Sequence, residues 1–473
     1  MLNQKRSIIK QRVKYAISDF IMTSLALFVF NIVRYELLLT HTFGSLWSYL
    51  GSRVLVLEQI FVPIGLMGVY FLSGYYNRPF RKSRLQELLV TTVTAAVNMA
   101  IIFLIFLIND PAPKRRTEYL VIFLLFAILL IFTYIGRVAI TISSLRYERY
   151  HASPVRTVII GNSHASRKMK KRIDKDISNI NYEVIAFVPI DGEHDVVDDG
   201  PVVSFSDIND FCRDNDVEQI IIALEHHDDT TVLRILDRLF PIGLPVKITP
   251  GILSYVTAGI RIDDIMAQPL IDLTSPRIGD FSVNVKRAFD VTLSFLALVI
   301  LSPLLLGVAI AVKMTSKGPV FYRQERMGRR QKPFTIYKFR SMYIDAEKSG
   351  PRLSNDNDPR VTDFGRFMRK YRIDEIPQFW NVIKGDMSIV GPRPEREFYI
   401  RQILKQAPYY CLVYQVRPGI TSWGMVKYGY ASTVKEMVGR TKYDLMYITN
   451  MSIPLDLKIM LFTIKTILSG RGK

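Results

Sequence analysis

Two neighbouring carboxylates stand between a basic run and a proline in the stretch Arg366-Phe367-Met368-Arg369-Lys370-Tyr371-Arg372-Ile373-Asp374-Glu375-Ile376-Pro377-Gln378, and Gly391-Pro392-Arg393-Pro394 follows it. Adjacent positions on a regular helix point about 100° apart. Asp374 and Glu375 can therefore serve one site only if they lie at a helix end or on a turn. Pro377 favours this placement, because proline is tolerated in the first turn of a helix and not in its interior.

The same stretch suits phosphate chemistry. The start of a helix offers free backbone N–H groups to phosphate oxygens, and Arg369 and Arg393 can add charge-assisted hydrogen bonds. Carboxylates supply the hard oxygen ligands that Mg²⁺ prefers. The stretch thus indicates a site for a metal ion and phosphate groups. From the dipeptide alone, a solvated and charged helix end is the simpler interpretation, so the surrounding sequence has to decide.

From Lys286 onward the chain resembles the bacterial sugar transferase family, the polyprenyl-phosphate phosphoglycosyl transferases. The matching blocks occur in the order in which the family has them, which makes the signal much stronger than any one block. They are Lys286-Arg287-Ala288-Phe289-Asp290, Ser302-Pro303, Gly318-Pro319-Val320-Phe321-Tyr322-Arg323-Gln324, Lys338-Phe339-Arg340-Ser341-Met342, Asp358-Pro359-Arg360-Val361-Thr362, Asp374-Glu375-Ile376-Pro377-Gln378, Gly385-Asp386-Met387-Ser388-Ile389-Val390-Gly391-Pro392-Arg393-Pro394 and Arg417-Pro418-Gly419-Ile420-Thr421.

The resemblance implies an integral membrane, multi-domain protein. Larger members of the family carry a four-helix transmembrane bundle, a degenerate Rossmann-like α/β middle domain and a mainly helical catalytic domain on a re-entrant membrane helix. Applied to this chain, these parts are expected at residues 1–150, 151–275 and 276–473, with the re-entrant helix at about 288–312. Motif-level specificity is confined to the C-terminal part.

Composition agrees with a membrane protein. Hydrophobic residues make up 49% of the 473-residue chain, and the formal net charge is +19. The basic residues flank apolar segments, which favours an anionic membrane surface and phosphorylated substrates and not nucleic acid. The two cysteines, Cys212 and Cys411, are too few and too far apart in sequence for a disulfide framework or a zinc cluster.

Four apolar segments, at 15–33, 54–75, 88–108 and 119–135, are each near the roughly 20 residues that a helix needs to cross a bilayer. Basic residues gather before the first segment, between the second and third, and after the fourth: Lys5, Arg6, Lys10, Arg12, Lys14; Arg78, Arg81, Lys82, Arg84; Arg137, Arg146, Arg149. This pattern predicts cytoplasmic termini, although Lys114-Arg115-Arg116 goes against it. Asp19 and Glu58 lie close enough to segment ends to reach the interface.

The middle domain has strand patterns at 156–161, 184–188, 219–224 and 246–248, and helical patterns at 164–173, 205–213 and 230–240. Alternating strands and helices predict a parallel, Rossmann-like sheet. The nucleotide fingerprint is degraded, because Gly161-Asn162-Ser163-His164-Ala165-Ser166 keeps one glycine of the three in GxGxxG. Tyr182 and Tyr255 also lack a lysine four residues on, which argues against an NAD-dependent sugar-nucleotide dehydratase or epimerase.

The apolar segment at 288–312 is long enough to cross a bilayer. Lys286 and Arg287 precede it and Lys313 follows it, so both ends have a cytoplasmic signature. Pro303 should bend the helix, and Ser302 can hydrogen-bond a carbonyl that the break frees. These features predict a helix that enters the membrane, bends and returns. A kinked through-span is the alternative. Ile453–Leu468 is either an amphipathic membrane helix or an ordinary packed one.

Roles at the site come from the resemblance. It implies that Asp374 is the nucleophile, that Glu375 binds Mg²⁺, and that Arg369 and Arg393 clamp phosphate oxygens. Lys338 and Arg340 match the family's Lys-Phe-Arg-Ser-Met block and are expected to face the diphosphate.

The resemblance further implies transfer of a hexose 1-phosphate from a UDP-sugar to undecaprenyl phosphate. The reaction would occur on the cytoplasmic face of the bacterial inner membrane and start an exopolysaccharide, capsule or O-antigen. An inactive membrane scaffold is the non-enzymatic alternative. The sugar, any ligand of the middle domain and a homodimer stay open. Two departures from the family pattern, Arg372-Ile373 and Ser422-Trp423, touch none of the proposed catalytic groups.

Overall fold

The computed structural model describes residues 2–40, 42–77, 79, 84–107, 115–151, 154–174, 182–190, 200–225, 229–248, 270–275, 278–347, 350, 352–353, 358–429 and 431–470. The chain forms two compact units. One comprises residues 1–153 and 279–285, and the other comprises residues 154–278 and 286–473.

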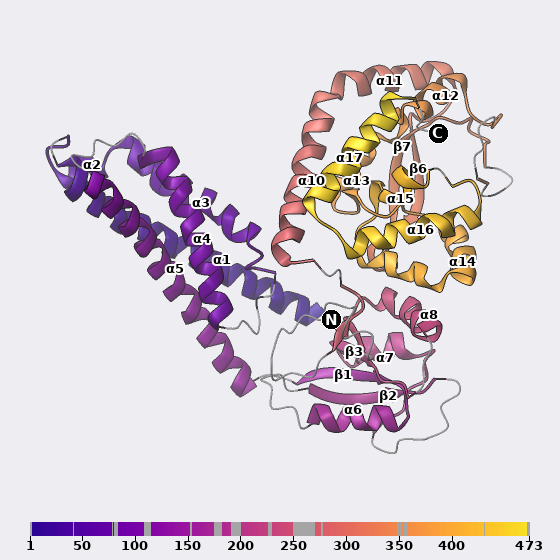
Figure 1. Cartoon of the computed structure of the whole chain (residues 1–473), viewed down its shortest axis with the longest axis horizontal. Coiled ribbons are helices and arrows are strands. Elements are labelled where there is room, and N and C mark those ends of the chain that lie inside the picture. The colour runs from indigo at the N-terminus through magenta and orange to yellow at the C-terminus, as the bar shows by residue number, and fades with distance from the viewer. Residues whose placement is uncertain are drawn as a thin grey trace. The chain divides into compact units, whose positions relative to one another are not determined.

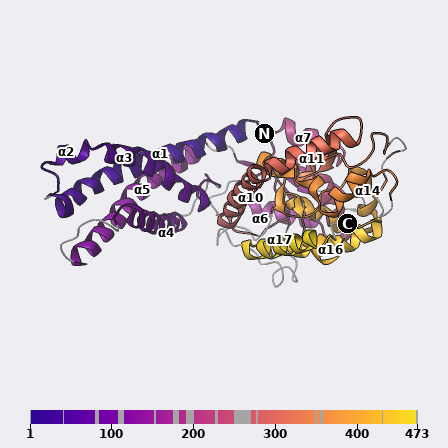
Figure 2. The ribbon, with the colours of Figure 1, turned by 90° about the horizontal axis from the view of Figure 1, so that it is seen from above.

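The first unit is a bundle of long helices, which run side by side in both views (Figures 1 and 2). Its elements are α1 (Leu2–Arg34), α2 (Leu46–Leu50), α3 (Arg53–Leu72), α4 (Arg84–Ile102) and α5 (Arg115–His151), with π-helical turns η1 (Tyr35–Leu39) and η2 (Phe103–Leu107). Within the described part of the chain, four helices are long and apolar enough to cross a membrane: Ile9–Leu39, Arg53–Leu72, Arg84–Leu107 and Arg115–Ser144. The prediction of four apolar N-terminal helices is confirmed, and they fit a membrane bundle.

A buried ion pair joins α1 to α5 inside this bundle. Arg137 Nε donates to Asp19 Oδ1 at 2.9 Å, and Nη2 donates to Asp19 Oδ2 at 2.8 Å. The guanidinium also lies over the rings of Tyr70 and Tyr75, at 4.6 and 3.8 Å from their centroids. Arg137 is fully buried, so it is not the flanking charge that the sequence pattern predicted. Asp19 is likewise buried inside the bundle, where each charge needs the other because both are out of water.

We expect Asp19→Ala to destabilise the bundle by about 3–5 kcal/mol, because it leaves a buried guanidinium unpaired. The double variant Asp19→Leu with Arg137→Met removes both charges and should recover most of that loss. Thermal unfolding in detergent of the parent and the two variants measures this. Equal melting temperatures for the single and double variants would contradict the stated cause, an unpaired buried guanidinium.

The second unit begins with a five-stranded mixed sheet in the order β2-β1-β3-β4-β5. Its elements are β1 (Val155–Ile160), α6 (His164–Asp174), β2 (Tyr182–Val188), α7 (Ile208–Asp214), β3 (Gln219–Ile222), α8 (Asp229–Leu239), η3 (Phe240–Ile242), β4 (Val246–Ile248) and β5 (Ile271–Asp272). Strands β1 to β4 are parallel, as the alternation of strands and helices predicted, whereas β5 pairs antiparallel with β4. The sheet is therefore mixed at one edge.

The rest of this unit is mainly helical (Figure 1). Its helices are α10 (Asp280–Ile300), α11 (Ser302–Thr315), α12 (Asp363–Lys370), α13 (Gln378–Lys384), α14 (Glu397–Gln406), α15 (Trp423–Lys427), α16 (Val434–Thr449) and α17 (Ile453–Leu468), with short turns η5 (Ile373–Glu375) and η6 (Pro408–Gln415). Strands β6 (Phe321–Met327) and β7 (Pro333–Phe339) form an antiparallel hairpin around the turn η4 (Arg329–Gln331), and β8 (Ser388–Val390) pairs parallel with β9 (Gly419–Thr421).

The helix axis bends by 63° between α10 and α11. The bend lies where the sequence placed it: Ser302 Oγ donates to Val299 O at 2.7 Å, and Pro303 occupies the first turn of α11. The serine thus takes up a carbonyl that the break leaves open. The bent pair is compatible with a broken span and with a re-entrant hairpin.

Candidate active site

The Asp374–Glu375 pair lies on a turn between two helices, as its spacing predicted. Helix α12 ends at Lys370, and Arg372 then takes a left-handed conformation with φ of 51°. The 3₁₀ turn η5 follows, and Pro377 directly precedes the first residue of α13. Because the α-helical conformation is interrupted both before and after the pair, the two neighbouring side chains can face one site. A continuous helix would prevent this.

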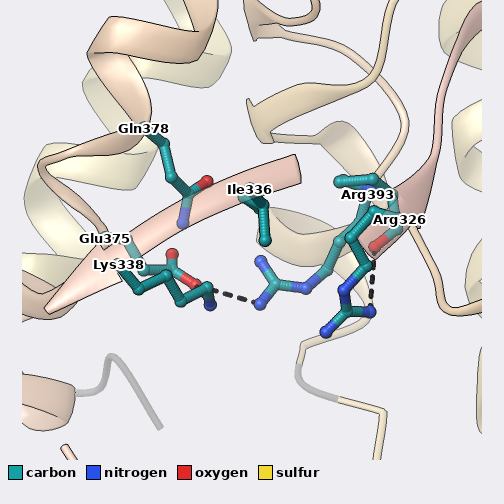
Figure 3. Close-up of a pocket in the computed structure, with 7 residues that line it drawn as sticks. Arg326, Ile336, Lys338, Glu375, Gln378 and Arg393 are labelled. Atoms are coloured by element: carbon teal, nitrogen blue, oxygen red, sulfur yellow. Dashed lines mark hydrogen bonds and ion pairs between the residues drawn. The ribbon is translucent and has the colours of Figure 1, made fainter. Parts of the chain in front are cut away.

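Glu375 is the centre of a cluster of cations. Lys338 Nζ, from β7, lies 2.7 Å from Glu375 Oε1, and Arg393 Nη2, from the loop after β8, lies 3.0 Å from the same oxygen. Arg372 Nη1 lies 3.3 Å from Oε2. Figure 3 shows Lys338 and Arg393 converging on this carboxylate from opposite sides. Asp374, by contrast, takes part in none of the ion pairs found among the described residues.

These groups open onto a small pocket. Its lining comprises Arg326, Ile336, Lys338, Glu375, Gln378, Arg393 and Pro394. The space is small, about 200 Å³ with the open solvent at its mouth included. Cationic and amide donors outnumber the single carboxylate, so the pocket suits an anionic part of a larger molecule, such as a phosphoryl group.

Burial and nearby charges shift the pKa values of the two adjacent carboxyl groups in opposite directions. Burial raises the pKa of Asp374 above its usual range, and the neighbouring Glu375 opposes its ionisation further, while Lys338 and Arg369 favour it. Burial would also raise the pKa of Glu375, but Lys338 and Arg393 hold that pKa well below its usual range. Burial in turn lowers the pKa of Lys338. Glu375 is therefore the permanently charged member of the pair, and Asp374 is the more basic one.

Comparison with known proteins identifies the family of the chain. The profile described as bacterial sugar transferase matches residues 281–470, and one described as a CoA-binding domain matches residues 72–250. An uncharacterized sugar transferase of Bacillus subtilis is 38% identical over 188 residues, which cover 40% of this chain and 89% of that protein. The chain belongs to the bacterial sugar transferase family.

Two longer relatives have more specific names. A UDP-N-acetylgalactosamine-undecaprenyl-phosphate N-acetylgalactosaminephosphotransferase of Aeromonas hydrophila is 40% identical over 239 residues, which cover 50% of this chain and 56% of the relative. A UDP-glucose:undecaprenyl-phosphate glucose-1-phosphate transferase of Klebsiella pneumoniae is 36% identical over 261 residues, with 55% and 56% covered. This sugar transferase thus spans little more than half the length of either relative.

The structure brings Lys338, Glu375 and Arg393 together in the pocket lining, whereas Asp374, the neighbour of Glu375, is not part of that lining. Arg369 Nε donates to Ser341 Oγ at 2.9 Å, and its charge reaches Asp374. Arg340 lies outside the pocket lining and donates to Ser316 O at 2.8 Å and to Ser316 Oγ at 2.9 Å. It therefore holds the end of α11, and a phosphate-binding role for it stays a prediction.

Sequence reasoning missed three residues at the pocket. Arg326 lines it and donates to Pro394 O at 3.2 Å and to Glu395 Oε2 at 3.4 Å. Glu395 also accepts a hydrogen bond from Arg440 on α16, so it fixes Arg326 from behind. Gln378 lines the pocket from α13. Gln378 is the last residue of the Asp374-Glu375-Ile376-Pro377-Gln378 block, and Glu395 directly follows Pro394. Nothing in the sequence, however, shows that Arg326 on β6 lies close to these two residues.

Asp444 on α16 is a buried acid behind this cluster. Its Oδ1 accepts the backbone N–H of Gly424 at 3.1 Å. Burial raises the pKa of Asp444 to about 6, although Arg440 opposes the rise. The folded protein therefore binds more protons at this position than the unfolded chain between about pH 4 and pH 6. Across that window the contribution of Asp444 to the free energy of unfolding falls as pH increases.

We expect Asp444→Asn to raise the melting temperature at pH 7.5, by the equivalent of about 1–3 kcal/mol, because asparagine keeps the acceptor and cannot ionise. The gain should shrink towards zero at pH 4.5, where the parent's aspartate is protonated in the folded state. Thermal unfolding of both proteins across this pH range is the measurement. A gain that does not change with pH would contradict the assignment.

Proposed function

We propose that this protein transfers a hexose 1-phosphate from a UDP-sugar to undecaprenyl phosphate, through a covalent intermediate on Asp374. The observation that carries the proposal is the turn with the adjacent Asp374 and Glu375, whose glutamate is held by cations in a small pocket rich in hydrogen-bond donors. Two relatives named for this class of reaction support it. Their names do not support an NAD-dependent dehydratase or epimerase, and the assembled site counts against an inactive scaffold.

In the first step, an Asp374 carboxylate oxygen attacks the phosphorus that carries the sugar. A bond forms between that oxygen and phosphorus, and the bond from phosphorus to the bridging oxygen breaks, so UMP leaves with the electron pair. The raised pKa of Asp374 supports this role, since it marks the more basic carboxylate of the pair. A covalent intermediate predicts ping-pong kinetics.

In the second step, an oxygen of undecaprenyl phosphate attacks the same phosphorus. The bond between Asp374 and phosphorus breaks, and the carboxylate is restored. Lys338 and Arg393 lie where they can pass from Glu375 to phosphoryl oxygens as charge develops there, and Arg369 adds positive charge beside Asp374. No proton needs to be transferred in either step.

The site's donor chemistry fits Mg²⁺ as a cofactor. No cluster of three or more metal-ligating side chains occurs in the described part of the chain, but Mg²⁺ is commonly held by one or two carboxylates together with substrate phosphates. Glu375, which stays ionised, would hold it, with Asp374 adjacent. The ion would supply charge neutralisation on the phosphate oxygens.

We infer that α10 and α11 form a re-entrant hairpin with the transferase domain on the cytoplasmic face of the inner membrane. Both ends of the pair are attached to the same domain. Arg287 on α10 donates to Val382 O at 2.7 Å and to Ile383 O at 3.0 Å, and Val312 on α11 packs with Phe339 and Met368. A through-span would separate such ends by the roughly 30 Å of the bilayer core.

The fold of the middle domain and the fate of the product complete the proposal. Strands β1 to β4 are parallel in the order β2-β1-β3-β4, which supports a Rossmann-like origin for the middle domain. A lipid-linked sugar diphosphate made on the cytoplasmic face is the starting point that an exopolysaccharide, capsule or O-antigen requires, so we assign the protein to that first step.

The reaction is tested with protein in nanodiscs, Mg²⁺, undecaprenyl phosphate and a panel of UDP-sugars. We expect UMP release with one sugar, dependent on the lipid, and a loss of at least about 10³-fold for Asp374→Asn, because the covalent path is removed. Asp363→Asn, at an exposed carboxylate of α12, is the matched control and should retain activity. Turnover that survives Asp374→Asn would eliminate the aspartyl intermediate.

The hairpin is tested by labelling single cysteines with a membrane-impermeant maleimide. Arg213→Cys lies before the bent pair and Lys317→Cys after it, and both positions are exposed. The native Cys212 and Cys411 are buried, so the parent chain reports the background. We expect both variants to react in inside-out vesicles and neither in intact cells. Reaction of the two positions from opposite faces would establish a through-span.

A further inference from the structure

The amide of Gln378 contributes a pocket donor without a protein partner among the described residues. The side chain of Gln378 is 2% exposed, yet its Nε2 makes no hydrogen bond to any residue that the structure describes. Gln378 is part of the pocket lining, and Figure 3 shows its amide nitrogen directed into the space beside Glu375 and Ile336.

Each cationic side chain in the lining donates to at least one protein acceptor, although Nε of Arg326 has none among the described residues. Lys338 and Arg393 both donate to Glu375 Oε1, and Arg326 donates to Pro394 O and to Glu395. A buried amide without an acceptor destabilises a folded protein. The unpartnered group is therefore best explained by an acceptor that arrives with a ligand.

The composition of the pocket identifies the kind of acceptor. Three cationic side chains and one carboxylate surround Gln378 Nε2, so an anionic oxygen is favoured over a neutral one. Gln378 also follows Asp374 by four residues, at the start of the helix that the turn leads into. Glu375, the neighbour of Asp374 in the chain, lines the same pocket as Gln378.

We propose that Gln378 is a substrate-binding residue whose amide donates a hydrogen bond to a non-bridging oxygen of the phosphoryl group under transfer. This deepens the proposed function and rests on it. The oxygen could come from the sugar nucleotide or from the lipid phosphate, and the two sources share this chemistry.

The test variant is Gln378→Met, which has a similar length and no donor. The proposal makes a paired prediction. Removal of the unpartnered donor should raise the melting temperature of the ligand-free protein by about 2–4 °C. Loss of a hydrogen bond to a charged oxygen should lower kcat/KM by about 10- to 100-fold. A purely structural role would move both in the same direction.

Kinetics separate the two sources. In a ping-pong reaction, kcat/KM for each substrate reports only its own half-reaction. A fall for both UDP-sugar and undecaprenyl phosphate is the expected result, because the transferred phosphoryl group takes part in both. A fall for one alone supports the hydrogen bond and assigns it to that substrate. An unchanged kcat/KM for both, or a loss explained by unfolding, overturns the proposal.

Asn381→Leu is the matched control, one turn along the same helix. Asn381 Oδ1 accepts the N–H of Tyr337 at 3.1 Å, and its Nδ2 donates to Thr335 O at 2.7 Å. Its amide is thus satisfied by the protein, so the substitution should lower the melting temperature, opposite in sign to Gln378→Met. If both variants raise the melting temperature, the rise reflects the introduction of an apolar side chain in general. The melting temperature of Gln378→Met would then no longer indicate an unpartnered donor, and this part of the inference would be overturned.

A binding measurement keeps the inference separate from the proposed function. Inorganic pyrophosphate should stabilise the parent against heat and should stabilise Gln378→Met less. If the parent releases no UMP from any UDP-sugar, the proposed function fails, and this difference still tests Gln378 as a phosphoryl ligand. Equal stabilisation of both proteins by pyrophosphate overturns the role of Gln378 even if the parent is active.

Discussion

The ion pairs from Lys338 and Arg393 to one oxygen of Glu375 join three segments that are distant in sequence. Lys338 comes from a hairpin strand, Glu375 from a turn between helices, and Arg393 from the loop after β8. Because Asp374 is the residue next to Glu375, fixing Glu375 also fixes the backbone of Asp374. Asp374, which takes part in no ion pair among the described residues, is thereby held at a defined position without a salt-bridge partner that a substrate would have to displace.

The same cluster solves an electrostatic problem. Two adjacent buried carboxylates cannot both ionise without nearby positive charge. Here Lys338, Arg393 and Arg372 are concentrated on Glu375, and Asp374 receives the weaker share. One carboxyl group is consequently held well below its usual pKa and the other above it. The asymmetry follows from where the cations point, since the two residues have the same kind of side chain and the same burial.

Local sequence patterns predicted the helices and strands well, but they predicted contacts between distant residues poorly. Apolar segment length gave the four long N-terminal helices, the alternation of strands and helices gave β1 to β4, and Ser302-Pro303 gave the bend. Antiparallel β5 was missed because it is a two-residue strand whose pairing is set by tertiary structure. Arg137 was read as a flanking charge, since its partner Asp19 lies 118 positions earlier. The motifs located Asp374 and Glu375, whereas Arg326 is recruited by contacts that no motif encodes.

The polar groups of the pocket differ in the free-energy cost of being buried without a hydrogen-bond partner. An unpaired buried charge costs far more than an unpaired buried amide, so the cationic donors need a protein acceptor when no substrate is bound. Glu375 serves as that acceptor for Lys338 and Arg393. Gln378 is neutral and can remain unpaired at a tolerable cost. In the membrane bundle, where no phosphate is expected, Arg137 has its Nε, Nη1 and Nη2 all engaged by protein oxygens. The pairings of Lys338 and Arg393 with Glu375, and the unpartnered Nε2 of Gln378, thus lie together at the site where we expect a substrate to bind.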